Sequence, residues 1–329
     1  MKGNRKFFAL LAAVALCVAL FAGCGKSEPT TPPAGGDAGS GTETPETGGV
    51  YKVGYVNSSD TDFFDKLKRD TFEALVKDDK TLEVSYSEAN MDVQRQLDLM
   101  DNYIAQGVDA IILVPADFSG VTPGIEKANA AGITVICMGI EAEGGDFIFV
   151  GSQNFDAGVM QGEFMAEALP ENAKVLYLQG TPGLYHSVER EDGFKGVLAE
   201  KRPDIEVIAT QTGMYERAKG MQITEDWIQT FPAFDAIVAA NDQMALGALE
   251  ALKGANRLEG VAVSGVDGTP EAKMAIKNGE MAQSVLQSAD GLAQYTYETI
   301  QTLQSGGTPE ARIIVPFESI TQENIADYE

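Results

Sequence analysis

The sequence predicts an α/β protein built from two doubly wound, Rossmann-like lobes, each with a largely parallel sheet. From residue 50 onward, short β-branched and aliphatic runs alternate with segments of helical periodicity, which is typical of successive βαβ units. Two such series follow one another along 329 residues, a length that suits about two domains of 100–200 residues each. Hydrophobic residues make up 44% of the chain and charged residues 22%, so each lobe can bury a core.

The first segment is predicted to be a signal peptide at residues 1–23. Three cations precede an apolar run at residues 7–21, which is shorter than the roughly 20 residues of a membrane-spanning helix. Small residues precede Cys24, and this arrangement resembles a bacterial lipobox, in which the cysteine receives a lipid. We therefore expect Cys24 to anchor the mature protein at the outer face of the bacterial cytoplasmic membrane. The alternative is an ordinary signal peptide followed by an incidental cysteine.

Residues 24–49 are predicted to comprise the lipidated Cys24 and a flexible linker. Gly, Pro, Ser and Thr dominate the linker, and alanine is its only apolar residue, so it cannot form a core. A random coil of this length spans roughly 25–30 Å, which lets an anchored body reach a nearby membrane partner.

The strands of the first predicted lobe are short apolar runs separated by helical stretches. They lie at residues 52–56, 82–87, 109–114, 133–138 and 147–150. A second series begins near residue 174 with KVLYLQ and continues with DIEVIAT, DAIVAA, GVAVSG and MAQSVL. Ligands of such sheets bind outside the carboxyl ends of the strands, so the residues just after each strand are candidates for a site.

Charge and composition exclude several classes of function. Asp and Glu outnumber Lys and Arg by 49 to 24, and a net charge of −25 opposes binding to nucleic acid. Three Cys and one His are too few for a Cys/His zinc site, so no metal or cofactor is expected. Cys137 stands in an apolar run and is expected to be a buried small hydrophobe.

No catalytic constellation emerges, and we expect the protein not to be an enzyme. The first strand is not followed by a G-x-G-x-x-G dinucleotide motif, and the chain has neither a G-x-x-x-x-G-K-[ST] phosphate loop nor a G-x-S-x-G nucleophile elbow. His186 is the only histidine and opens a predicted helix, where a pocket or surface role is a better interpretation than a catalytic one.

Several motifs of the body occur together in a fixed order. They are Phe63-Phe64, Ala110-Ile-Ile-Leu-Val-Pro115, Leu178-Gln-Gly180, Arg190-Glu-Asp-Gly-Phe194, Asn241-Asp-Gln-Met-Ala-Leu-Gly-Ala-Leu249 and Gly265-Val-Asp-Gly-Thr-Pro270. In this pattern the chain resembles the type I periplasmic sugar-binding proteins, and among them the ribose-binding proteins. The last two motifs are the most specific, because both fall at strand ends of the second half. The resemblance implies two lobes that are joined by three crossing segments and close on a ligand by a hinge motion.

The resemblance also implies where the two lobes begin and end. The crossing segments are expected near residues 151–153, 287–289 and 315–316. The N-terminal lobe then comprises residues 50–152 plus 288–315, and the C-terminal lobe residues 153–287 plus 316–329.

Sugars pack their C–H faces on aromatic rings and share hydroxyl groups with planar carboxylates and amides. The resemblance places Phe63 and Phe64 where the family stacks its sugar, and Tyr215 in the place of a second stacking aromatic. It implies that Asp267 and Asn241 hold the hydroxyl groups of the ligand. Gln287 is expected to contribute at the hinge, and the further candidates for polar contacts are Asn57, Thr61, Glu141 and His186.

Local structural roles compete with these assignments. Phe63 and Phe64 are alternatively core residues at the start of a helix. Either Asn241 or Asp242 can cap the helix that follows, and capping by Asp242 would leave the Asn241 side chain free for a ligand. Asp267 lies in a glycine-bracketed turn, where aspartate is common for local reasons.

Several polar positions of the ribose-binding pattern are changed here. An Asp-Arg pair after the fourth strand is replaced by Gly139 and Ile140, and an Asn, an Arg and another Asn are replaced by Val114, Val188 and Thr61. A hydroxyl group that faces apolar atoms loses roughly 1–3 kcal/mol. Ribose in its usual orientation is therefore a poor fit. A deoxy sugar, a hexose in another pose and a heterocycle-bearing or signalling ligand stay open.

The resemblance implies a monomeric solute receptor for an ABC-type sugar importer. The ligand would shift an open–closed equilibrium, and the closed shape would be recognised by a membrane permease. The alternative is a receptor of the same fold that senses a sugar or a furanose signal and presents its closed form to a membrane sensor. A sugar-responsive repressor is disfavoured, because the predicted anchor and linker occupy the place of a DNA-binding head.

Overall fold

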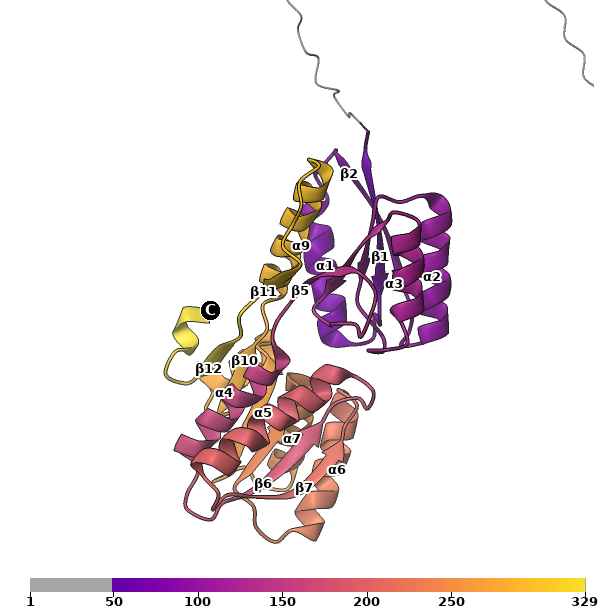
Figure 1. Ribbon diagram of the computed structural model, residues 1–329. Coiled ribbons are helices and arrows are strands. Elements are labelled where there is room, and N and C mark those ends of the chain that lie inside the picture. The colour runs from indigo at the N-terminus through magenta and orange to yellow at the C-terminus, as the bar shows by residue number, and fades with distance from the viewer. Residues whose placement is uncertain (1–48, 329) are drawn as a thin grey trace, which may run out of the picture. The chain divides into compact units, whose positions relative to one another are not determined.

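A computed structural model of the chain describes residues 49–328 (Figure 1). The predicted signal peptide, the predicted lipidation site at Cys24 and residues 25–48 of the predicted linker lie outside the described residues. None of the helices described combines the length and the apolar character that a membrane span requires. The fold and the candidate site both lie within this body.

The N-terminal lobe is built around a six-stranded parallel sheet in the order β11-β5-β4-β3-β1-β2. Its strands are β1 (Tyr51–Asn57), β2 (Leu82–Glu88), β3 (Ala110–Leu113), β4 (Thr134–Met138), β5 (Phe147–Gly151) and β11 (Arg312–Ile314). Two helices pack on each face of this sheet. They are α1 (Phe63–Val76) and α9 (Ala289–Gln304) on one face, and α2 (Val93–Gln106) and α3 (Thr122–Ala130) on the other.

The C-terminal lobe repeats this plan with a sheet in the order β12-β10-β9-β8-β6-β7, in which only β12 runs antiparallel. Its strands are β6 (Lys174–Gln179), β7 (Glu206–Thr212), β8 (Ala236–Ala239), β9 (Ala262–Asp267), β10 (Gln283–Leu286) and β12 (Glu318–Thr321). Its helices are α4 (Asn154–Ala168) and α5 (Tyr185–Lys201) on one face, α6 (Arg217–Thr230), α7 (Asp242–Gly254) and α8 (Pro270–Lys277) on the other, and a terminal 3₁₀ turn (Ile325–Tyr328). The predicted fold class, two parallel-sheet α/β lobes, is confirmed.

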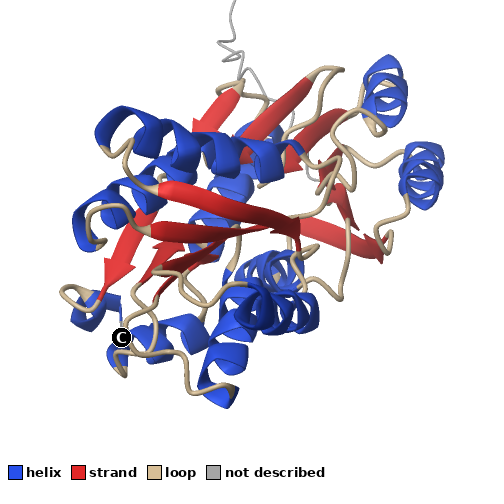
Figure 2. Cartoon of the chain, turned by 90° about the horizontal axis from the view of Figure 1, so that it is seen from below, coloured by secondary structure: helices blue, strands red, loops and turns tan. Residues whose placement is uncertain are grey.

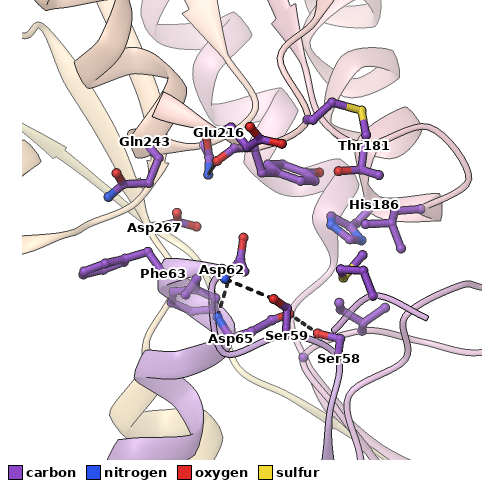
Figure 3. A pocket seen from close by; sticks show the side chains of 18 of the residues that line it. Ser58, Ser59, Asp62, Phe63, Asp65, Thr181, His186, Glu216, Gln243 and Asp267 are labelled. Atoms are coloured by element: carbon purple, nitrogen blue, oxygen red, sulfur yellow. Dashed lines mark hydrogen bonds between the residues drawn. The ribbon is translucent and has the colours of Figure 1, made fainter. Parts of the chain in front are cut away.

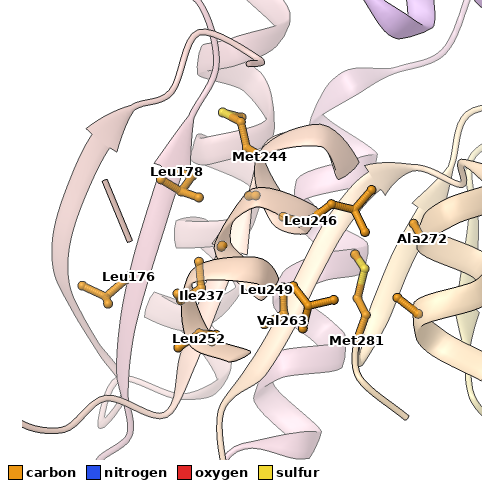
Figure 4. Packing of buried hydrophobic residues seen from close by; sticks show 14 of the residues in the cluster. Leu176, Leu178, Ile237, Met244, Leu246, Leu249, Leu252, Val263, Ala272 and Met281 are labelled. Carbon is orange, nitrogen blue, oxygen red and sulfur yellow. The ribbon is translucent and has the colours of Figure 1, made fainter. Parts of the chain in front are cut away.

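Helices cover both faces of the strands (Figure 2), and this arrangement explains the sequence pattern. Strands β3 and β8 are buried at every residue, so they read as continuous apolar runs instead of alternating ones. Figure 4 shows the packing of the C-terminal lobe, where Leu176, Leu178 and Ile237 of the sheet meet Met244 and Leu249 of α7. Two short strands, β11 and β12, were not predicted. They lie at the sheet edges and are only three and four residues long, so neither forms a long apolar run.

Three short segments connect the two sheets. Residues 152–153 lead from β5 to α4, residues 287–288 lead from β10 to α9, and residues 315–317 lead from β11 to β12. Motion between the lobes therefore needs only changes in the backbone torsions of these segments, as in hinge-type domain closure.

Helices α4 and α5 approach closely because glycines line their contact. A Cβ atom at Gly158 would lie 2.0 Å from the carbonyl oxygen of Arg190 on α5. We expect Gly158→Ala to lower the free energy of unfolding by about 2–3 kcal/mol, because backbone atoms must move apart. The matched control is Gly196→Ala on α5, where nothing lies within 4 Å, and here a gain of about 0.5–1 kcal/mol is expected. Urea unfolding measures both changes, and equal effects would contradict this packing.

Candidate ligand-binding site

A cavity of about 520 Å³ lies between the two lobes, where loops at the carboxyl ends of both sheets meet. This volume is within the range of small-molecule sites, roughly 300–1,000 Å³. Figure 3 shows Asp62 and Phe63 of the N-terminal lobe facing Glu216, Gln243 and Asp267 of the C-terminal lobe. The cavity is lined by most of the predicted site residues, namely Thr61, Phe63, Phe64, His186, Tyr215, Asn241, Asp267 and Gln287.

Aromatic side chains enter the cavity from both lobes. Phe63, at the first turn of α1, is 41% exposed and Phe64 is 9% exposed, so the first presents a free ring to the cavity. On the opposite lobe, Tyr215 stacks on His186 with ring centroids 5.3 Å apart. A Cβ atom at Gly180 would lie 2.1 Å from the Tyr215 ring, so only glycine leaves room for this stack. These rings form surfaces on which the C–H faces of a sugar ring can pack.

His186 is half-buried in this stack, and its surroundings favour the neutral form of the ring. Burial lowers its pKa well below the usual value, and the charges of Arg190 and Lys68 lower it further. Its Nδ1 atom has no hydrogen-bond partner among residues 49–328. A neutral imidazole at the cavity wall can accept or donate one hydrogen bond to a ligand hydroxyl group.

Asn241 caps α7 itself, and the alternative in which Asp242 takes that role is wrong. The Asn241 Oδ1 atom accepts from the backbone N–H of Met244 at 3.0 Å, and Nδ2 donates to the carbonyl oxygen of Tyr215 at 3.3 Å. Asp242 turns into the core instead, where it accepts from Thr269 N–H at 2.8 Å and from the Ser284 hydroxyl at 2.7 Å. Asn241 lines the cavity, and its side-chain oxygen and one N–H already form these local hydrogen bonds, so its second N–H is the group available to a ligand.

Asp267 combines burial, backbone strain and a free carboxylate. It ends β9 with a φ of 128°, a value that favours glycine, and strain of this kind is common at binding sites. The side chain is 5% exposed and has no hydrogen-bond partner among the described residues, although it lines the cavity. Burial raises its pKa well above the usual value, and the neighbouring charges of Asp242 and Asp62 raise it further. An acceptor of this kind is available for donors of a ligand.

Arg190 contacts residues at all three crossing segments. It belongs to one of the sequence motifs but was not predicted as a site residue. Its Nε donates to Asn154 Oδ1 at 3.0 Å, just after the first crossing, and a terminal nitrogen donates to Gln287 Oε1 at 3.2 Å, on the second. The guanidinium carbon lies 5.9 Å from the ring centroid of Phe317, on the third crossing. The other terminal nitrogen donates to the carbonyl oxygen of Ala240 at 2.6 Å.

The N-terminal wall of the cavity carries charges that were also not predicted. Lys68 of α1 is buried and forms an ion pair with Asp65 at 2.7 Å. A Cβ atom at Gly139 would lie 3.0 Å from its ammonium nitrogen, so the glycine leaves space for Lys68. Burial raises the pKa of Asp62, the N-cap of α1, to about 6, and the adjacent Asp65 charge contributes. Gly139 and Ile140 replace the polar Asp-Arg pair of the ribose-binding pattern. The Lys68 side chain of α1 places a cation at this part of the wall.

Two predicted candidates do not line the cavity. Asn57 is fully buried, and its Nδ2 donates to Ser59 O and Asp60 Oδ1, both at 2.8 Å, so it orders the loop after β1. Glu141 forms an ion pair with Arg312 and lines a separate cavity of about 40 Å³ near the crossings.

The substituted positions and the remaining reactive groups are also placed. Val188 is 47% exposed and does not line the cavity, whereas Val114 is fully buried. Cys137 is buried, as predicted, and burial raises the pKa of its thiol. Across residues 49–328 no cluster of His, Cys, Asp and Glu could hold a metal ion.

The comparisons with known proteins place this two-lobed cavity in a family. The model of the periplasmic binding protein domain matches residues 53–308. The chain belongs to the type I periplasmic sugar-binding protein family. A putative rhizopine-binding protein of Rhizobium meliloti is 31% identical over 275 residues, which cover 82% of this chain and 89% of the relative. A ribose import binding protein of Bacillus subtilis is 31% identical over 269 residues, which cover 82% and 86%.

Solved structures of the family agree with the observed architecture. An ABC transporter solute-binding protein of Bacillus halodurans, with bound myo-inositol, matches with a TM-score of 0.82 and 30% identity. The match covers 86% of this chain and 99% of that one. A periplasmic solute-binding protein of Actinobacillus succinogenes, with bound D-allose, matches with a TM-score of 0.79 and 27% identity over 84% of this chain and all of that chain. The resemblance noted in the sequence is thus confirmed at the level of family and fold.

Proposed function

We propose that this protein is the extracytoplasmic solute receptor of an ABC-type importer, and that it binds one small polyhydroxylated molecule, a monosaccharide or a cyclitol. The observation that carries the proposal is the cavity of about 520 Å³, which is lined from both lobes and by Gln287 on a crossing segment. One relative is named a ribose import binding protein, and a related structure contains bound myo-inositol. Both support this choice of ligand.

Binding is coupled to closure in this proposal. A ligand that contacts both lobes stabilises the arrangement in which they lie together, so it shifts the open–closed equilibrium toward the closed form. Phe118 of the N-terminal lobe and Tyr185 of the C-terminal lobe stack with ring centroids 4.9 Å apart, which shows that the lobes can meet away from the crossings. A permease would recognise the surface that the two lobes form together.

The proposal includes a lipid anchor at Cys24 and a single protein chain as the working unit. The anchor would hold the receptor at the outer face of the cytoplasmic membrane, and the linker would let it reach the permease. In the sensing alternative the same closed form would contact a membrane sensor, and capture of the membrane partner with the ligand-bound protein distinguishes the two roles.

A thermal-shift screen tests the proposed function. The panel contains pentoses, hexoses, deoxy sugars, polyols, cyclitols, furanoses and nucleosides. We expect at least one compound to bind with micromolar-range affinity, about −8 kcal/mol, and to stabilise the fold by about 2.7 kcal/mol at a hundredfold excess over its dissociation constant. If no compound in the panel moves the transition, the proposal is wrong.

A further inference from the structure

Most of the charged side chains that line the cavity are neutralised by near neighbours. Lys68 is paired with Asp65 at 2.7 Å, and Glu216 with Lys219 at 2.7 Å. Arg217 is bonded to two glutamates on neighbouring helices. The first two pairs carry no net charge, and the two glutamates more than offset the charge of Arg217, so none of these groups leaves a free cation at the cavity.

The remaining charges do not balance. Asp62, Asp267 and Arg190 are left, and His186 is not counted because burial lowers its pKa and favours the neutral imidazole. Arg190 donates its hydrogen bonds to the side-chain amide oxygens of Asn154 and Gln287 and to the backbone carbonyl oxygen of Ala240. Among the described residues, no carboxylate is hydrogen-bonded to it. When both carboxyl groups are ionised, the cavity keeps one negative charge even if Arg190 offsets one carboxylate through space.

The two carboxylates approach the cavity from opposite lobes. Asp62 stands at the start of α1 and Asp267 at the end of β9, and Figure 3 shows both directed into the space between the lobes. The Asp62 carboxylate accepts from the backbone N–H of Asp65 at 2.9 Å, and a hydrogen bond from the backbone N–H of Phe64 also lowers its pKa. The Asp62 charge contributes to the raised pKa of Asp267, so the two groups lie within electrostatic reach of each other.

We propose that the ligand carries a protonated amine, as an amino sugar or an amino cyclitol does, and that its ammonium group lies between Asp62 and Asp267. This inference rests on the proposed function and narrows its ligand class. An ammonium group has three donors and no acceptor, which matches two carboxylates that line the cavity and still have acceptor positions available. A neutral polyol would leave a buried charge uncompensated when the lobes close, so one carboxyl group would have to take up a proton.

Isothermal titration at pH 7.5 with matched pairs of compounds tests the proposal. Each pair consists of an amine and its hydroxyl counterpart, for example D-glucosamine with D-glucose, D-galactosamine with D-galactose, and 1-amino-1-deoxy-scyllo-inositol with scyllo-inositol. We expect at least one amine to bind ten times more tightly than its counterpart. If only hydroxyl compounds bind, or if both members bind equally, the inference is overturned while the proposed function stands. If no compound of the pairs or of the wider screen binds, both are overturned.

A pair of aspartate variants separates charge recognition from a structural role. Asp62→Asn keeps a good N-cap but removes the charge, so we expect the affinity for the amine to fall about tenfold more than the affinity for its hydroxyl counterpart. Asp92→Asn is the matched control, because Asp92 caps α2 through the same contact, at 2.9 Å to Arg95 N–H, and does not line the cavity. A loss of affinity for both compounds alike in Asp62→Asn would contradict the inference.

Discussion

The Asp267→Asn variant is expected to bind the ligand about 30-fold more weakly and, without ligand, to be more stable than the parent protein. The weaker binding follows because a carboxylate that accepts from two donors is replaced by an amide that offers one acceptor, a loss of about 2 kcal/mol. The higher stability follows because the Asp267 carboxylate is buried without a hydrogen-bond partner among the described residues. Titration calorimetry and urea unfolding measure the two effects on the same samples.

The pH dependence of the free energy of unfolding shows whether the ionised Asp267 side chain stabilises or destabilises the fold. In the unfolded chain an aspartate loses its proton near pH 4, whereas in the folded protein the raised pKa of Asp267 keeps the proton bound to higher pH. The folded state therefore binds more protons in this interval, and the free energy of unfolding must fall as pH rises through it. Asp267→Asn should reduce the fall in the free energy of unfolding with rising pH.

Asp156→Asn is the control, because Asp156 is exposed on α4, and it should change neither this pH dependence nor the affinity. If Asp267→Asn left the affinity unchanged, Asp267 would not belong to the site.

The Arg190→Met variant is expected to lose about 3 kcal/mol of stability and most of its affinity. Methionine fills part of the space but leaves Asn154 Oδ1, Gln287 Oε1 and the carbonyl oxygen of Ala240 without their donor. It also removes the cation that lowers the pKa of Asp267, so the charge imbalance of the cavity grows. Unfolding by urea and ligand titration measure the two losses.

Arg95→Met is the control for Arg190→Met. Arg95 is largely exposed, and its contact with Glu88 is a single ion pair at 3.7 Å, so its replacement should change stability by less than about 0.5 kcal/mol. If Arg190→Met were as mild as this control, the contacts of Arg190 with the crossing segments would not stabilise the fold.

The fold was predictable because its central strands are buried on both faces. Continuous apolar runs such as those of β3 and β8 mark parallel strands. The edge strands β11 and β12 were missed for the complementary reason, since a short, partly exposed strand needs no apolar run.

The candidate site was predictable best where residues lie at or near the carboxyl ends of strands. Asp267 is the last residue of β9 and Asn241 lies two positions after the end of β8, so their place at the cavity could be predicted from the sequence. Lys68 and Arg190 lie on helices and reach the cavity through long side chains, and nothing in their helical pattern separates them from solvated cations. The capping role of Asn241 depends on which of two adjacent polar side chains turns inward, which only the packing of Asp242 decides.

The central claim is that ligand binding draws the two lobes together, and a distance measured between them tests it most directly. Spin labels at Asn102→Cys on α2 and Glu225→Cys on α6 report one exposed position in each lobe. Cys17 and Cys24 are replaced by serine in this sample, and Cys137 is buried from the label. With a saturating amount of the ligand found by the screen, we expect the distance distribution to narrow and to shift to shorter values by several ångströms. An unchanged distribution in a sample that calorimetry shows to be fully bound would contradict the account.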